Sequence, residues 1–199
     1  GEKDETSNEA GFDYDLQGVT LGVDYRILDN LIFGVAGGLG GVESDYHGNS
    51  GGLDIESVSA SAFLTYFRDE TFYADLLMTY GENDYDSKRN IRFDAGNMAL
   101  VDRTASGDTD GTQFSFGGGL GWDFSRDAWT WGPHAGLYHY RVEVDAFRES
   151  GAGGLDLAIG DQEVTSLTGN AGGHLSFAIL TDWGVLLPNA AGTLVTFFG

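Results

Sequence analysis

The stretch that decides the fold is Gln17-Gly-Val-Thr-Leu-Gly-Val-Asp-Tyr-Arg-Ile-Leu-Asp-Asn-Leu-Ile-Phe-Gly-Val-Ala-Gly-Gly-Leu-Gly40. Its first part alternates in character, with Val19 and Leu21 apolar and with Thr20 and Asp24 polar. Successive side chains of a strand point to opposite faces of a sheet, so the alternation predicts a strand with one apolar face and one polar face. Turn-forming residues follow at 28–30, after which the alternation resumes. The stretch therefore predicts two antiparallel strands joined by a tight turn.

The same unit repeats along the chain and predicts an all-β fold. We expect eight strands at 12–27, 31–43, 55–67, 71–84, 111–124, 129–144, 164–180 and 184–198. Tight turns are expected at Leu28–Asn30, Arg68–Glu70, Ser125–Asp127 and Thr181–Trp183. The other three joins are long and rich in glycine, aspartate, asparagine and serine, so all short turns lie at one end of the sheet. That asymmetry is typical of bacterial outer-membrane proteins and predicts an up-and-down antiparallel transmembrane β-barrel with eight visible strands.

Composition sets limits on the kind of protein. A chain of 199 residues suits one domain, and we take 1–199 as a single outer-membrane domain whose residues 1–11 form an acidic extracellular N-terminal segment. The absence of cysteine excludes disulfides and thiolate metal sites, and no apolar run reaches the length of a membrane-spanning helix. The net charge of −21 argues against a nucleic-acid partner.

The distribution of charge follows the expected strands. Most of the 31 acidic residues fall within 1–15, 41–56, 82–111 and 143–163. These segments are expected to be connections or the N-terminal segment, so we expect the charge to lie outside the strands. Only Asp24, Asp75 and Asp123 remain inside expected strands, apart from acids in the short turns.

A soluble eight-stranded barrel is the alternative, because alternation does not say which face is inside. The polar faces consist of glycine, serine and threonine, and the two lysines, Lys3 and Lys88, lie outside the expected strands. Aromatic residues gather near the strand ends on the apolar face, as in the interfacial girdle of a membrane protein. They are Tyr25, Tyr66, Phe72, Tyr80, Trp122, Phe124 and Trp129. Both features favour the membrane barrel.

A series of short motifs resembles the translocator barrels of autotransporters. The motifs are Gly11–Arg26, Asp110-Gly-Thr-Gln-Phe114, Gly132–Arg141, Phe147–Leu155 and Trp183-Gly-Val-Leu-Leu-Pro188. The resemblance implies a twelve-stranded barrel, of which the second to ninth strands are expected in this sequence. It also implies a passenger domain N-terminal to the barrel, insertion by the barrel-assembly machinery, and a place in the outer membrane of a Gram-negative bacterium among lipid and lipopolysaccharide.

The function expected from this resemblance is that of a membrane anchor and translocator for a secreted passenger, without enzymatic activity or a cofactor. One alternative is a small closed surface barrel that serves adhesion or membrane structure. Another is an outer-membrane hydrolase. The sequence offers weak support for the hydrolase: Gly48-Asn-Ser-Gly-Gly52 matches the G-x-S-x-G pattern, but it lies in an expected loop and not at a strand-to-helix elbow.

Metal binding has equally weak support. Asp108-Thr-Asp-Gly111 resembles the start of a calcium loop but lacks the later ligands, and the spacing of His47, His139 and His174 supports no metal site. The sequence favours weak binding of divalent cations by the acidic segments together over a defined metal site.

Charged side chains on the polar faces form the remaining candidate site. Counting from the turns places Asp24, Arg26, Asp75, Asp123 and His134 on the inner face near the periplasmic end. We interpret them as a lumenal network of ion pairs and hydrogen bonds that compensates buried charge. An acid–histidine catalytic group is the alternative.

Overall fold

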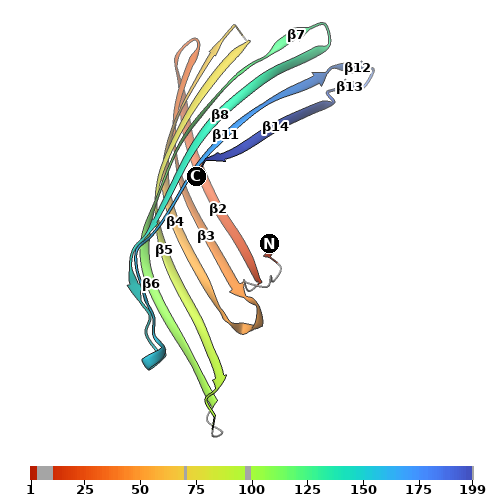
Figure 1. Ribbon diagram of the computed structural model, residues 1–199. Coiled ribbons are helices and arrows are strands. Elements are labelled where there is room, and N and C mark those ends of the chain that lie inside the picture. The colour runs from red at the N-terminus through yellow and green to blue at the C-terminus, as the bar shows by residue number, and fades with distance from the viewer. Residues whose placement is uncertain (4–10, 70, 97–99, 199) are drawn as a thin grey trace.

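The computed structural model describes residues 1–3, 11–69, 71–96 and 100–198, and most of them form one curved antiparallel sheet (Figure 1). Its strand order is β1-β2-β3-β4-β5-β6-β8-β11-β14, with β7 paired to β8. The strands of this sheet are β1 (Glu2–Lys3), β2 (Phe12–Leu28), β3 (Leu31–Tyr46), β4 (Gly51–Arg68), β5 (Phe72–Asp94), β6 (Leu100–Trp122), β7 (Phe124–Arg126), β8 (Trp129–Val144), β11 (Gln162–Phe177) and β14 (Asn189–Phe198). Two small hairpins and two single-turn 3-10 helices complete the chain: β9 (Phe147–Arg148) with β10 (Ala158–Ile159), β12 (Ile179–Thr181) with β13 (Gly184–Leu186), η1 (His47–Asn49) and η2 (Gly153–Leu155).

The eight expected strands are confirmed as β2, β3, β4, β5, β6, β8, β11 and β14. Each pairs antiparallel with its neighbour in sequence, so the sheet is an up-and-down meander. The turns also lie where the sequence predicts them. Asp69 and Asp127 adopt the left-handed conformation, with φ of 52° and 55°, which aspartate tolerates better than most residues. The last turn is the tip of the β12–β13 hairpin, and Glu70 of the second turn lies outside the described residues.

Two of the three expected long loops are wrong. Residues 47–50 alone join β3 to β4, and β5 and β6 extend as a paired ribbon to Asp94 and Leu100. At about 3.3 Å per residue, the 23 residues of β5 reach roughly 75 Å, far beyond an apolar band about 25 Å tall. The physical reason is backbone hydrogen bonding: pairing satisfies the N–H and C=O groups of these polar segments better than a loose loop would. Only residues 145–161 form a long join.

Many acidic residues therefore lie in strands and not in the loops where the sequence predicted them. Those of 41–56 and 82–111 lie mostly in the outer halves of β3, β4, β5 and β6, so the expectation that charge lies outside the strands is wrong. The strands simply continue past the apolar band into water. Among the described residues no helix is long and apolar enough to cross a membrane.

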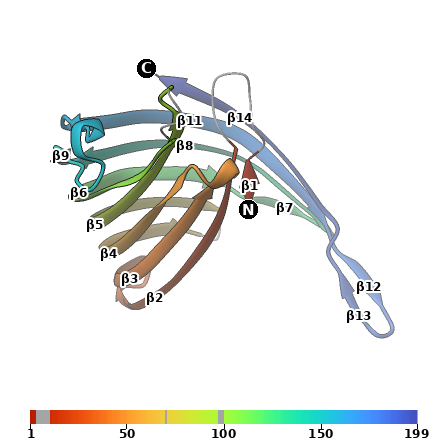
Figure 2. The ribbon, with the colours of Figure 1, turned by 90° about the horizontal axis from the view of Figure 1, so that it is seen from below.

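The sheet is curved but open. Among the described residues β2 and β14 each pair with one long neighbour and not with each other, and Figure 2 shows the gap between them. The alternative of a small closed eight-stranded barrel does not match this open sheet. An eight-stranded interior is only wide enough for side chains. The polar face carries rings such as Phe63, Tyr73 and Tyr138, which favour a wider arc.

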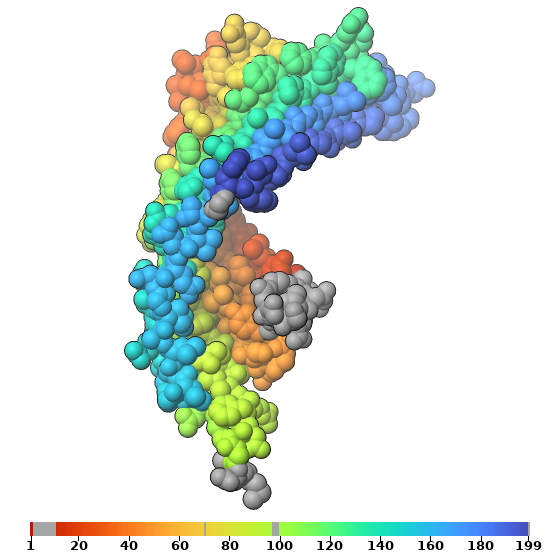
Figure 3. All heavy atoms as spheres, in the orientation of Figure 1, coloured from red at the N-terminus to blue at the C-terminus, as the bar shows by residue number. Residues whose placement is uncertain are grey.

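The two faces of the sheet differ in exposure. In residues 54–61 of β4 and over most of β6 the residues of the polar face are less exposed than those of the apolar face, as expected for the inner side of the curved sheet in Figure 3. Leu21 and Val58 on the apolar face are 77% and 59% exposed, and the buried hydrophobic residues of the described chain are Ala105 and Ala152. A fold with so small a core of its own needs an apolar environment around its outer face.

The faces predicted for β2 to β11 agree with the register, but the face predicted for β14 is wrong. Thr193 stands opposite Gly172 of β11, which stands opposite His134 of β8. The hydrophobic pattern of the expected strand 184–198 predicts Ala191, Val195 and Phe197 on the apolar face, but the register puts them on the polar face with Thr193. The cause is the β12–β13 hairpin, which separates β11 from β14 and shifts the count.

Candidate functional site

The polar face is built from small residues with rings laid over them. Serine and threonine hydroxyls bond across the strands, as between Ser61 Oγ and Thr79 Oγ1 at 2.8 Å. The Tyr138 ring on β8 covers Gly117 on β6, where a β-carbon would collide with it. Glycine therefore lets the sheet keep a bulky aromatic side chain flat against its inner wall.

The strand register places the residues of the predicted lumenal network one by one. The register puts Asp24, Arg26, Asp75 and His134 on the polar face. Arg26 stacks on the Phe67 ring, with its guanidinium carbon 5.4 Å from the ring centroid. A single connected network of the five residues remains a prediction.

Two further residues join this layer. His174 Nε2 lies 2.9 Å from Asp123 Oδ1, an oxygen shielded from water, and His134 Nε2 lies 3.2 Å from Thr193 Oγ1. Sequence reasoning missed His174 and Thr193, because their partners are set by the pairing of β6, β8, β11 and β14 and not by spacing along the chain. Both histidine contacts are typical of structural pairs in a sheet wall.

The structure gives the proposed serine nucleophile a structural role. Ser50 Oγ donates a hydrogen bond of 2.5 Å to the backbone oxygen of His47, and His47 Nε2 lies 3.5 Å from Asp13 Oδ2. The serine hydroxyl thus closes the η1 turn and its proton points to a carbonyl. A nucleophile would instead need its proton on a base.

The calcium-loop resemblance is also not supported. Asp108 and Asp110 lie in the regular strand β6, opposite Asp86 and Asp84 of β5. A calcium loop wraps its ligands around an ion, whereas a strand presents them in a flat row. Among the described residues no group of three or more histidine, aspartate or glutamate side chains is arranged to hold a metal.

Instead, the outer face carries rows of carboxylates beyond the apolar band. Across five adjacent strands Asp15, Glu43, Asp54, Asp86 and Asp108 stand opposite one another in order. Like charges directly opposite each other destabilise a sheet.

The row next to it has the same arrangement. There Glu56 faces Asp84, which faces Asp110. The pKa of Asp84 is raised, first by a hydrogen bond with Asp110 and then by partial burial and by the charges of Asp110, Glu56 and Asp86. This end of the sheet therefore favours an environment that supplies cations.

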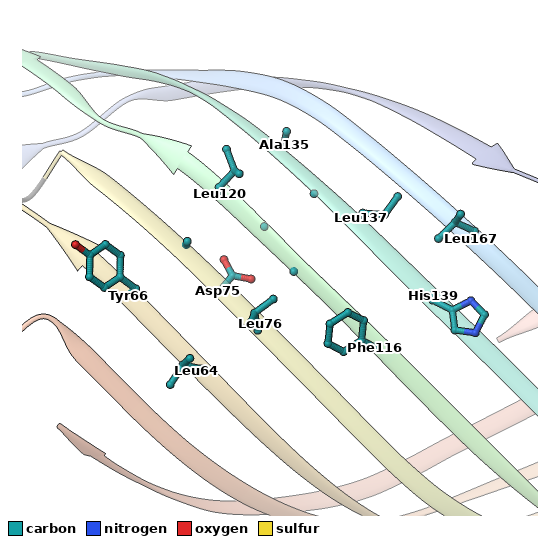
Figure 4. A pocket seen from close by; sticks show the side chains of 14 residues that line it. Leu64, Tyr66, Asp75, Leu76, Phe116, Leu120, Ala135, Leu137, His139 and Leu167 are labelled. Atoms are coloured by element: carbon teal, nitrogen blue, oxygen red, sulfur yellow. The ribbon is translucent and has the colours of Figure 1, made fainter. Parts of the chain in front are cut away.

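A shallow groove of about 630 Å³ lies on the apolar face (Figure 4). Its floor is formed by small residues such as Ala74, Gly118 and Ala135. Larger side chains surround it, and His139 stands beside Phe116 and Leu167 at one end. The groove continues the apolar face and suits contact with lipid.

These features define a class. The sheet has an apolar outer face and an inner face of small residues. It has tight turns at one end and polar strand extensions at the other. This combination is typical of the wall of an outer-membrane barrel. The comparisons with known proteins name the family. The chain matches the family model "Autotransporter beta-domain" over residues 1–199, and it belongs to the autotransporter β-domain family.

Two solved structures share the fold. The translocator domain of autotransporter NalP from Neisseria meningitidis superposes with a TM-score of 0.70 at 23% identity, covering 92% of this chain and 61% of that one. The β-domain of the Bordetella autotransporter BrkA gives 0.60 at 22% identity, covering 99% and 76%. The sequence-based assignment to autotransporter translocators is confirmed, and with it the placement in the outer membrane of a Gram-negative bacterium.

A curated relative adds a second association. Esterase EstA of Pseudomonas aeruginosa is 33% identical over 191 residues, which is 90% of this chain and 27% of that protein. The chain spans about a quarter of the length of the curated relatives it matches.

Proposed function

We propose that this chain forms most of the wall of an outer-membrane barrel that anchors a passenger polypeptide and lets it reach the cell surface. The observation that carries the proposal is an exposed apolar outer face combined with an inner face rich in glycine, serine and threonine, on a sheet with tight turns at one end and polar strand extensions at the other. The tight turns face the periplasm, and the acidic extension of β5 and β6 stands outside the cell.

Further strands complete the barrel in this proposal. The long edges of β2 and β14 have no long partner on their outer sides among the described residues, and the chain covers only part of the NalP and BrkA domains. An open sheet edge cannot remain in lipid, where its backbone groups would lack hydrogen-bond partners. A wider barrel would also leave room for a polypeptide, which eight strands would not.

The proposal includes the partners of the outer face. Lipid covers the apolar band and its groove, and divalent cations bridge the carboxylate rows to the phosphates of lipopolysaccharide. The barrel-assembly machinery inserts the sheet. The directly opposed carboxylates support the cation bridge, because a cation between them would relieve their repulsion.

The lumenal residues serve structure in this proposal, and we assign no catalysis to them. Asp123 with His174 and His134 with Thr193 tie β6, β8, β11 and β14 together near the turns. The relation to Esterase EstA suggests a hydrolase in the whole protein. We assign any such activity to a passenger, because Ser50 closes a turn in this chain.

The test is export of a tagged passenger. The full-length protein, with an epitope in the passenger, is produced in a Gram-negative host and probed on intact cells with added protease. We expect surface-exposed epitope only when residues 1–199 are present, together with a barrel whose gel mobility changes on boiling. A correctly folded, boil-sensitive barrel with all epitope retained in the periplasm would reject translocation.

A further inference from the structure

The outer half of β6 has an edge that β8 does not cover. The pairing of β6 with β8 ends at Gly111 opposite Val144, whereas β6 continues to Leu100. On its other side β6 stays paired with β5 through Asp94. An uncovered strand edge is a template for any extended polypeptide, because its N–H and C=O groups are ready to bond.

Residues 145–157, here called the strap, lie along this edge. Ser106 and Ser150 exchange two backbone hydrogen bonds of 2.8 Å each, and the Asp145 amide donates to the Asp110 carbonyl at 2.9 Å. Ala105 of β6 and Ala152 of the strap are fully buried. The strap thus occupies backbone groups that another strand would use.

Side chains hold the strap in place. Arg89 of β5 donates from Nε and Nη2 to the two oxygens of Glu149 at 3.0 and 2.5 Å, and it also donates to the Leu155 carbonyl at 3.0 Å. Glu149 is 6% exposed and also accepts a bond from the Leu157 amide at 2.9 Å. A second attachment comes from Arg103 of β6, whose Nη1 donates to the Ala152 carbonyl at 2.7 Å.

The packing of the strap reaches the inner side of the ribbon. The Phe147 ring lies over Gly107, where a β-carbon would stand 2.5 Å from Phe147 Cε2. The register places Gly107 and Arg89 on the polar face of β6 and β5. The strap therefore covers the side of the ribbon that faces an emerging polypeptide.

We propose that the strap guards the outer edge of β6 against strand addition by an extended polypeptide, and that the Arg89–Glu149 pair is its lock. The inference rests on the proposed function, since the polypeptide in question is an unfolded passenger leaving the barrel. The chemistry recognised is general: a backbone in the extended conformation supplies donors and acceptors that match residues 101–110. The strap shields the backbone groups of Ser106 and the carbonyl of Asp110 within this edge.

The test uses the full-length protein in lipid nanodiscs. The variant is Glu149→Gln, and the matched control is Glu143→Gln, which alters an exposed ion pair with Arg141 that does not involve the strap. Hydrogen exchange is measured at residues 101–110, together with binding of a fluorescent ten-residue Thr-Val repeat peptide with a terminal lysine. We expect exchange roughly tenfold faster and new peptide binding in Glu149→Gln only.

A disulfide supplies the rescue. Because the sequence contains no cysteine, Ser106→Cys with Ser150→Cys places one bond between strap and edge. Oxidation should return exchange and peptide binding of Glu149→Gln to the wild-type values. If Glu149→Gln does not fold, Arg103→Ala replaces it, since it loosens the second attachment.

Two results would overturn the proposal. Unchanged exchange in Glu149→Gln would show that the pair is no lock, and fast exchange without peptide binding would show that the edge is no docking site. Both measurements are independent of export, so a wild-type protein that exports nothing would reject the proposed function and leave these results readable.

Discussion

The ring of Tyr138 occupies the space that a β-carbon on Gly117 would need, and the two residues are register partners on β8 and β6. The inner wall is therefore fitted at this point and does not tolerate an added side chain. We expect Gly117→Val to lower the stability of the folded barrel by about 1–3 kcal/mol, since overpacking forces side chains off their preferred rotamers. The temperature at which gel mobility changes measures the effect.

A matched control for this substitution is Gly192→Val on β14. No atom lies within 4 Å of a β-carbon at 192. That variant should unfold at nearly the wild-type temperature, and equal losses in the two variants would contradict the account of the Tyr138 contact.

The two faces of β2 should respond oppositely to charge. Leu21 on the outer face is 77% exposed, and Thr20 points to the inner face. Leu21→Arg should reduce membrane insertion strongly, because an arginine on the lipid side costs about 2–4 kcal/mol at the midplane. Thr20→Arg should insert nearly as well as the wild type. The inserted fraction is measured by flotation with vesicles, and equal tolerance would show that the faces are assigned wrongly.

The strap should open in acid. The hydrogen bond from Arg89 lowers the pKa of Glu149, helped by the Leu157 amide and by the Arg89 charge, while partial burial opposes them. A carboxyl with a lowered pKa in the folded state contributes stability above its ordinary value, about 4.3, and loses it as the pH falls through the lowered value. Protease cleavage within 145–157 should therefore rise below pH 4.3. Glu149→Gln should be cleaved alike at all pH values, and a wild-type profile that does not change with pH would refute the lock.

The stability of the carboxylate rows should depend on pH in the opposite direction from that of the strap: it should fall as the pH rises. The raised pKa of Asp84 means that the folded state favours its protonated form, so stability is present at low pH and is lost as the pH rises through the raised value. At neutral pH we expect Asp84→Asn to protect the outer half of β5 from protease in EDTA, and to lose most of that advantage in magnesium. Asp102→Asn is the control, because Asp102 faces a cation and not another carboxylate: its Oδ2 lies 3.9 Å from Arg92 Nε. Identical behaviour of the two variants would rule out repulsion as the cause.

The contact between His174 and Asp123 on the inner wall should affect the stability of the barrel and not the export of the passenger. His174→Gln removes the imidazole contact with Asp123 and should lower the unfolding temperature by a few degrees, since partly exposed polar pairs contribute about 1 kcal/mol or less. The rate of passenger export should stay at the wild-type value. A large fall in export by a fully folded variant would instead assign the pair a role in passage.

The sequence by itself determined the strands, the tight turns and the faces of most of the sheet. Alternation is a local property, since each residue of a strand points opposite to the last, and the residues of 17–40 are sufficient to reveal it. The family resemblance likewise rests on motifs that stay contiguous in the chain. Aspartates at the turns carry their own local reason, because they tolerate the left-handed conformation found at Asp69 and Asp127.

The tertiary structure alone decided how far the strands run and which distant residues meet. Residues 85–94 and 100–110 look like polar loop in isolation and become strand only because β5 and β6 satisfy each other's backbone groups. The pairing of β3 to β6 sets carboxylates opposite one another. The fold of the sheet also brings His174 to Asp123, and the pairing of β11 with β14 puts Ala191, Val195 and Phe197 on the inner face. Glu149 and Arg89 are 60 residues apart, and no spacing predicts their contact. The local hydrophobic pattern and the turns set the register between strands that are neighbours in sequence, but the register between distant strands depends on the alignment of every pair between them.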